Sequence, residues 1–344
     1  MTNTIITVMI QTVMIILPVE SPGVVPNQEV SMYFPTAGIE CHPFFPFCVA
    51  IGVSFVTSMG GVSGAFLLLP FQMSFLGYTN PSVSATNQFF NVLSCPAGVW
   101  RYWREGRLVW PLTATVAIGT LPGVFAGAFI RINWLPDPAR FKIFTGLVLL
   151  YVGGKMLWDL RGKEHASIAE TNAQHVERSF YAGQKNGVET AVQSNACTRL
   201  VWNSRTFIFD FQNQEFAVPC RRLALLSLVV GLVGGVYGIG GGAIMAPFLV
   251  SLFGLPVYAV AGATLFATFL TSVAGVNFYS LLAPLYPGIA VAPDWRMGLL
   301  LGLGGMMGMY MGARCQKYVP ARVLKYLLAG ILLFTAARYL GQTL

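Results

Sequence analysis

Two glycine clusters inside apolar sequence are the parts of this chain best suited to binding chemistry. They are Gly60-Gly61-Val62-Ser63-Gly64 and Gly238-Ile239-Gly240-Gly241-Gly242. Glycine costs about 1 kcal/mol relative to alanine in a helix interior, so such dense clusters favour a helix break. Within a membrane, a break frees backbone N–H groups that must face protein, water or ligand. Helices resuming at Ser63 and Gly241 would offer their N-terminal amides to an anion.

Uncharged polar side chains on the segments that follow could complete this anion site. Asn87, Asn91 and Ser94 are spaced by four and three residues and therefore share one helical face. A shift of 177 positions places a threonine opposite each of them. Polar residues that only hold two helices together would give the same pattern. We predict substrate-binding roles for Gly61, Ser63, Gly64, Asn87, Asn91, Ser94, Gly240, Gly241, Gly242, Thr264, Thr268 and Thr271.

The clusters belong to a long internal repeat. MGGVSGAFLLLPF, residues 59–71, returns as YGIGGGAIMAPF, residues 237–248. The 177-residue shift also superposes Pro70 on Pro247, and after a short insertion a shift of 185 continues the register. An almost uncharged, duplicated unit of this kind is typical of membrane transporters.

Other glycines recur at intervals of four residues and predict close helix packing rather than binding. They are Gly119, Gly123 and Gly127 with their counterparts Gly304, Gly308 and Gly312. A nucleotide-binding glycine loop is disfavoured, because neither cluster sits in a soluble βαβ unit.

Composition indicates a helical protein with many membrane crossings. Hydrophobic residues make up 55% and charged residues 10% of the 344 positions, against about 25% charged in a typical soluble domain. No Asp, Glu, Lys, Arg or His occurs in 43–100 or in 223–293. Since about 20 apolar residues cross a bilayer as a helix, each tract holds several crossings. The predicted fold is an all-α polytopic membrane protein built from two helical repeats.

The chain divides into four regions. Residues 1–43 are an N-terminal apolar segment and an irregular connector, and residues 159–222 are a polar insert, expected on the cytoplasmic side. Membrane repeat 1, residues 44–158, and membrane repeat 2, residues 223–344, are called the first and second copy below. The expected apolar segments are 44–58, 63–77, 82–103, 108–130 and 142–158, then 223–237, 241–254, 258–281, 296–313 and 324–340. In the insert, TFIFDF and QEFAV read as strands around a polar turn at 212–214.

The symmetry of the repeat depends on the two short segments that meet at each glycine cluster. They could form one broken helix, two tilted spans or a re-entrant hairpin. An odd number of crossings per copy would give inverted repeats, and an even number parallel ones. The loop around Arg104 is basic, whereas the equivalent loop around Pro287 has no basic residue. The positive-inside rule therefore favours inverted repeats.

Several classes of function are unsupported. The net charge of +8 is spread over loops without the basic, aromatic patch of a nucleic-acid binder. The six cysteines show no CxxC spacing, so we expect no metal site. All three histidines lie in connectors and no acidic proton relay occurs within the apolar tracts, so we expect no catalytic residues, no enzyme and no cofactor. The expected partners are a small anion and the lipid bilayer, with no nucleic acid; a homo-oligomer is left open.

With these motifs, the chain resembles the sulfite exporter TauE/SafE family, also called the toluene sulfonate uptake permeases. The resemblance rests on the G-x-G-G-G-x-x-x-x-P-x-L pattern at 238–249 and on Trp295-Arg296 followed by Gly308, Gly312, Ala313 and Arg314. It covers roughly 45–160 and 223–340. The first copy departs from the pattern at Val62-Ser63, and the insert and N-terminal extension lie outside the usual compact form. The resemblance implies transport of sulfur-containing or related organic anions across the bacterial inner membrane.

The sequence therefore favours a secondary transporter or facilitator for sulfite, thiosulfate, a sulfonate or another organic anion. Two alternatives remain open: an anion channel, since half-helices also line pores, and a membrane sensor that signals through the 159–222 insert.

Overall fold

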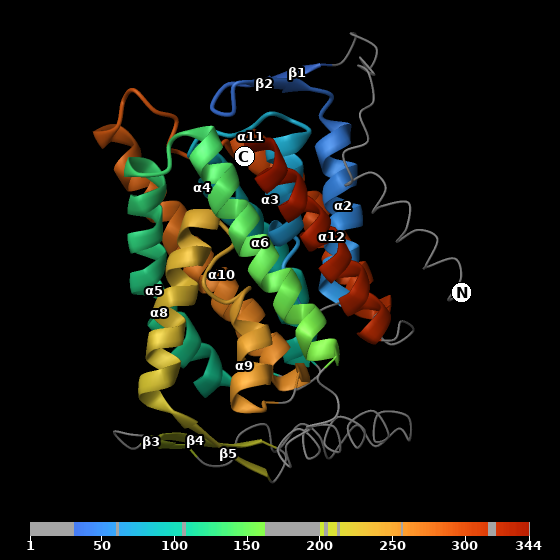
Figure 1. Cartoon of the computed structure of the whole chain (residues 1–344), viewed down its shortest axis with the longest axis vertical. Coiled ribbons are helices and arrows are strands. Elements are labelled where there is room, and N and C mark those ends of the chain that lie inside the picture. Colours follow the sequence, from blue (N-terminus) through green and yellow to red (C-terminus); the bar gives the residue numbers. More distant parts are fainter. Residues whose placement is uncertain are drawn as a thin grey trace.

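The computed structural model describes residues 31–59, 62–104, 108–161, 200–202, 206–211, 214–255, 257–315 and 321–343. These residues are nearly all helical, with ten α-helices packed into one bundle (Figure 1). The helices are α2 (Phe44–Met59), α3 (Ala65–Ser74), α4 (Ser82–Arg104), α5 (Trp110–Asn133), α6 (Pro138–Arg161), α8 (Cys220–Tyr237), α9 (Met245–Phe253), α10 (Val257–Leu282), α11 (Trp295–Cys315) and α12 (Ala321–Thr343). A short 3-10 helix, η3 (Ala283–Leu285), follows α10.

Four of the described helices are long and apolar enough to cross a membrane. They are Trp110–Asn133, Pro138–Trp158, Cys220–Tyr237 and Val260–Leu285. The apolar helices α2 and α3 are shorter, with 16 and 10 residues. The chain is therefore a multi-pass membrane protein, and each apolar segment expected from the sequence contains one helix.

Two small sheets lie at opposite ends of the bundle (Figure 1). The strands β4 (Thr206–Phe211) and β5 (Gln214–Pro219) pair antiparallel, with Phe211 opposite Gln214, and β3 (Leu200–Trp202) adds to β4; residues 212 and 213 of the predicted turn lie outside the described residues. At the other end, β1 (Met32–Phe34) pairs with β2 (Ile39–Cys41). We refer to the β1–β2 end and the β3–β5 end of the bundle below.

The β1–β2 hairpin differs from the irregular connector expected for this part of the chain. Its turn is held by a distant carboxylate: Asp294 Oδ2 accepts hydrogen bonds from the backbone N–H groups of Thr36 and Ala37, at 3.2 and 3.1 Å. Phe34 is fully buried beneath it. A contact with a residue 257 and 258 positions away leaves no local sequence pattern, which is why the hairpin was missed. The N-terminal apolar segment at 4–19 lies outside the described residues.

The evenly spaced glycines pack helices together, as predicted. A Cβ on Gly123 of α5 would meet the backbone oxygen of Leu228 in α8, and a Cβ on Gly308 of α11 would meet that of Ile51 in α2. Neighbouring glycines repeat these contacts along both helix pairs. Leu228 and Ile51 are themselves 177 positions apart, so the two interfaces use equivalent residues of the two copies.

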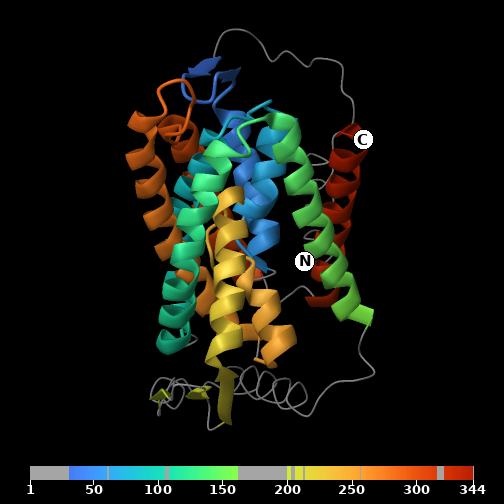
Figure 2. The same ribbon diagram turned by 60° about the vertical axis from the view of Figure 1, so that its left-hand side comes forward.

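The helix pair α2–α3 and the helix pair α8–α9 enter the bundle from different ends. The loop that follows α3 lies against the β1–β2 hairpin, since Asn80 Nδ2 donates a hydrogen bond to Thr36 O at 3.2 Å. Both α2 and α3 thus meet the β1–β2 end. By contrast, α8 runs inward from the β3–β5 end and α9 runs back to it (Figures 1 and 2). The two helix breaks therefore lie inside the bundle.

Candidate functional site

The first break lies between Met59 and Ala65, where Gly64 caps the start of α3. Ser63 Oγ donates to Asn91 Oδ1 at 2.5 Å and accepts from the backbone N–H of Ala65 at 3.3 Å. Asn87 Nδ2 donates to Ala65 O at 2.9 Å. The structure thus brings Ser63, Asn87 and Asn91 together at the first turn of α3. Gly61 lies outside the described residues.

The second break is a longer turn between Tyr237 and Met245 that packs against the polar face of α10. The N–H of Gly241 donates to Thr271 Oγ1 at 2.9 Å. A Cβ on Gly242 would meet Thr264 O and would lie 2.6 Å from Thr268 Oγ1. The second cluster and the three threonines are therefore in direct contact.

The expectation that a helix resumes at Gly241 was wrong, since α9 begins only at Met245. Gly238 and Gly240 have φ values of +83° and +74°, a left-handed backbone that keeps the chain out of the helix. Gly64 is in the ordinary helical region, with φ −58°. The unusual backbone geometry of the breaks is thus located at Gly238 and Gly240.

The two copies meet between α4 and α10, near both breaks. Asn91 Nδ2 donates to Ser272 Oγ at 3.3 Å, and a Cβ on Gly275 would collide with the amide of Gln88. Asn91 thus connects Ser63 at the first break with Ser272 of the second copy. In turn, a Cβ on Gly240 would lie 2.6 Å from Ser272 Oγ. Hydrogen bonds thus join Ser63, Asn91 and Ser272, and Ser272 packs against Gly240 of the second break.

Most hydrogen-bond donors of the predicted site already have acceptors. The hydroxyls of Thr264, Thr268 and Thr271 each donate to the carbonyl four residues earlier, at 2.7–2.9 Å. These side chains are at most 2% exposed. In this conformation the three hydroxyls are bonded to carbonyls of α10 itself, and an anion would have to replace existing hydrogen bonds.

Three side chains near the breaks are buried without a hydrogen-bond partner. They are Ser94 at Oγ, Gln88 at both amide atoms and Ser54 at Oγ. Ser94 was predicted, whereas Gln88 and Ser54 were not among the predicted site residues. Ser54 is 10 positions before Gly64 in sequence, but a Cβ on Gly64 would lie only 2.5 Å from its Oγ. Unpaired buried polar atoms cost free energy, so these groups are candidates to contact a bound substrate.

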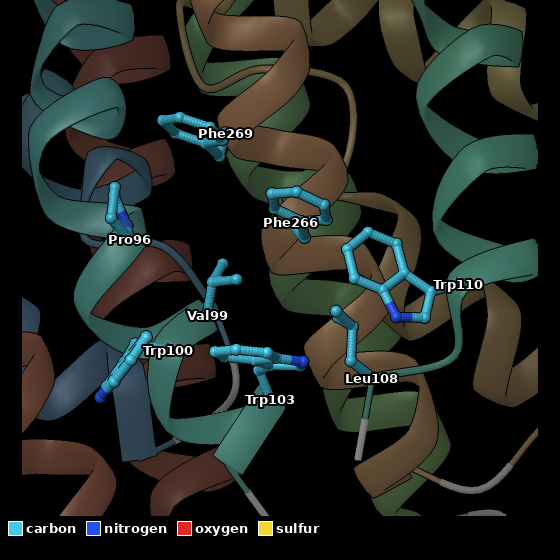
Figure 3. A pocket seen from close by; sticks show the side chains of 8 residues that line it. All are labelled: Pro96, Val99, Trp100, Trp103, Leu108, Trp110, Phe266 and Phe269. Atoms are coloured by element: carbon cyan, nitrogen blue, oxygen red, sulfur yellow. The ribbon is translucent and has the colours of Figure 1, made fainter. Parts of the chain in front are cut away.

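Two of the cavities in the described part of the chain have no predicted site residue in their lining. The larger, about 320 Å³, is apolar and lies between α4, α5 and α10 (Figure 3). Its lining consists of Pro96, Val99, Trp100, Trp103, Leu108, Trp110, Phe266 and Phe269. The three tryptophans are about half exposed, as in the aromatic belts at membrane interfaces. Among the described residues, no group of three or more His, Cys, Asp or Glu side chains could hold a metal ion.

Comparison with known proteins identifies the family. A probable membrane transporter protein from Xylella fastidiosa (strain 9a5c) is 23% identical over 214 residues, which cover 59% of this chain and 61% of the relative. No solved structure matches. The family model described as sulfite exporter TauE/SafE matches residues 46–339, which include all ten helices except the ends of α2 and α12. The chain therefore belongs to the sulfite exporter TauE/SafE family.

Proposed function

We propose that this protein is a secondary transporter or facilitator that moves a small anion, such as sulfite, thiosulfate or a sulfonate, across the bacterial inner membrane. The observation that carries the proposal is the pair of internal helix breaks joined through Asn91 and Ser272. The N-terminal ends of α3 and α9 both start inside the bundle. Their positive dipole ends favour an anion there without any charged side chain.

In this proposal the two copies are inverted repeats with re-entrant helix pairs, α2–α3 and α8–α9. Three features support the inversion. The two pairs approach from opposite ends of the bundle (Figures 1 and 2). The interfaces of α2 with α11 and of α8 with α5 use equivalent residues. Equivalent helices also pack on each other, α4 on α10 and α6 on α12. Such repeats give a transporter two mirror-related states, open to one side or the other.

The charge distribution supports a cytoplasmic β3–β5 end. The described basic residues nearest this end include Arg101, Arg104, Arg221, Arg222 and Arg314. At the β1–β2 end, Arg131 is fully buried and donates to the backbone oxygens of Leu135 and Thr79, so it does not act as a surface charge. Arg140, Lys142, Arg296 and Arg338 also lie at the β1–β2 end, so the positive-inside rule favours an outward β1–β2 end through the larger number of basic residues at the β3–β5 end.

The closed interior favours a transporter over a permanently open channel. Ser63, Asn91 and Ser272 are at most 1% exposed, so both breaks are sealed by packing. Alternating access requires such an occluded state, whereas a conducting pore does not. Purified protein in liposomes should therefore show saturable counterflow of labelled sulfite or sulfonate, and its absence alongside anion conductance would establish a channel.

Substitutions at the breaks test the proposed site directly. Leucine at Gly64 or Gly241 would collide with Ser54 and Thr120, respectively, so Gly64→Leu and Gly241→Leu should each abolish counterflow while the protein remains in the membrane. Gly154→Leu is the matched control, because a Cβ on Gly154 meets nothing within 4 Å. Normal counterflow by either variant would show that the glycine clusters serve only in helix packing and not in transport.

The inverted arrangement has its own test. Single cysteines at Arg104 and Pro287, in an otherwise cysteine-free protein, should react with a membrane-impermeant maleimide from opposite faces of the membrane. Labelling of both positions from the same face would establish parallel repeats and remove the basis for a twofold site.

A further inference from the structure

The larger cavity, of about 320 Å³ between α4, α5 and α10, shares no lining residue with the proposed central site (Figure 3). All of its lining side chains are apolar or aromatic. On α4 the lining extends from Trp103, next to the last residue of the helix, inward to Pro96. That separation corresponds to about 10 Å along the helix axis at about 1.5 Å per residue. Since the hydrocarbon core of a bilayer is about 30 Å thick, the cavity fits within one leaflet, the one at the β3–β5 end.

The outer end of this cavity is bordered by two tryptophans and an arginine, called the rim below. Trp100 and Trp103 pack together with their ring centroids 5.2 Å apart, and they are 54% and 53% exposed. The exposed Arg104 places its guanidinium carbon 6.0 Å from the centre of the Trp100 ring. Tryptophan is enriched at the level of the lipid headgroups, where a basic residue attracts anionic lipids. An apolar interior below a positively charged rim is complementary to a phospholipid with a negative headgroup.

The inner wall of the cavity is a feature of the repeat. Trp110 contacts Phe266 edge to face, with ring centroids 5.4 Å apart. The equivalent residues of the other copies, Trp295 and Phe89, make the same edge-to-face contact at 4.8 Å. This aromatic pair therefore packs helices of the two copies against each other, and it needs no ligand to explain it.

The rim, by contrast, is confined to the first copy. The 177-residue shift replaces its two tryptophans and its arginine with Asn277, Ser280 and Leu281 of α10. The equivalent end of α10 thus forms a helix without any of the three side chains. Because the helix fold does not require the rim, its position at the outer end of an apolar cavity points to binding.

We propose that this cavity is a specific site for an anionic phospholipid. An acyl chain lies in the apolar interior along α4, and the phosphate lies beside Arg104. The bound lipid contacts α4 and α5 of the first copy and α10 of the second, so it fills a gap where the two copies meet. The site does not rest on the proposed function, since lipid binding needs no transport.

Fluorescence quenching tests the site, because a brominated acyl chain quenches the tryptophans that it contacts. The test uses full-length protein in bilayers that keeps Trp100, Trp103 and Trp110 and has phenylalanine at every other tryptophan position. Brominated phosphatidylglycerol should quench at about fivefold lower mole fraction than brominated phosphatidylcholine. Arg104→Gln should remove most of this preference. Arg222→Gln, an exposed charge at the same end that does not line the cavity, should keep it.

Native mass spectrometry provides a second measurement that does not use the tryptophans as reporters. The wild-type protein should retain phosphatidylglycerol, and the double variant Trp100→Asn, Trp103→Ser, which carries the residues of the second copy, should lose it. Equal quenching by the two lipids, or a preference unchanged by Arg104→Gln, would overturn the site. Disulfide-linked dimers of Trp103→Cys without retained phosphatidylglycerol would also overturn it, because a second copy of the chain would then cover the cavity. Absence of counterflow would overturn the proposed function and leave the lipid result standing.

Discussion

The two helix breaks occupy equivalent positions in the repeat but are built differently. The first is short and bounded by amide side chains, with Asn91 bridging Ser63 and Ser272. The second is a longer turn with left-handed glycines, and its backbone N–H at Gly241 is held by the hydroxyl of Thr271. The first break is thus held mainly by hydrogen bonds of side chains, and the second by left-handed glycine backbone and a backbone N–H bonded to a hydroxyl.

Adding one methyl group should have very different consequences at the two breaks. In Gly242→Ala, the new Cβ meets backbone atoms, Thr264 O and the N–H nitrogen of Thr268 at 2.7 Å, which cannot move without shifting α10. We expect the free energy of unfolding to fall by about 3 kcal/mol or more, and size-exclusion chromatography to show little folded protein. Gly64→Ala meets the side-chain oxygen of Ser54 at 2.5 Å and should cost only about 1–2 kcal/mol.

The double variant Gly64→Ala, Ser54→Ala is the control for this contrast. Removing the Ser54 hydroxyl should restore the stability of Gly64→Ala, whereas no single side-chain deletion should restore Gly242→Ala. Equal destabilisation of the two alanine variants, without rescue, would show that the two breaks are equally rigid.

Removing a polar side chain from the first copy should lower substrate affinity more than removing its counterpart from the second copy. Asn91→Ala removes an amide, and losing a hydrogen bond to a charged group should weaken anion binding by about ten- to a hundredfold. Thr268→Ala should also weaken it, but less, because the Thr268 proton is donated to Thr264 O. Val83→Ala, on another face of α4, should change affinity little. If Asn91→Ala lowered the melting temperature and left affinity unchanged, the polar face would serve only to hold helices together.

The smallest expected difference is in the stability lost on replacing Thr271 and on replacing its counterpart Ser94. Thr271→Val removes the acceptor of the Gly241 N–H and should cost about 1–3 kcal/mol. Ser94→Ala should be nearly neutral, because Ser94 Oγ has no partner. The apparent melting temperature in detergent measures both, with Thr271→Ser as the conservative control. A large loss for Ser94→Ala would indicate that its hydroxyl is engaged in a state other than the closed one.

The sequence predicted the helical segments because hydropathy and glycine density are local signals. The β4–β5 strands followed equally from their alternating residues. The start of α9 could not be predicted from the sequence, because glycine adopts helical and left-handed backbone with similar ease. Only the structure shows that Gly240 is left-handed. Ser54 was missed because its proximity to Gly64 depends on how α2 and α3 fold back, and the contact of Asn91 with Ser272 depends on how two distant helices pack. The substrate-binding role of all these residues stays a prediction.

The exchange of partners between the two copies has a consequence for biosynthesis. Helix α2 packs on α11, which begins roughly 240 residues later in the chain. At about 5–20 residues per second of synthesis, α2 waits on the order of ten to fifty seconds in the membrane before its partner exists. During that time the backbone of α2 that Gly308 later covers, and the Ser58 side chain that Gly312 later covers, are without their packing partner. The first copy must therefore stay in the membrane without part of its packing surface until α11 has been made.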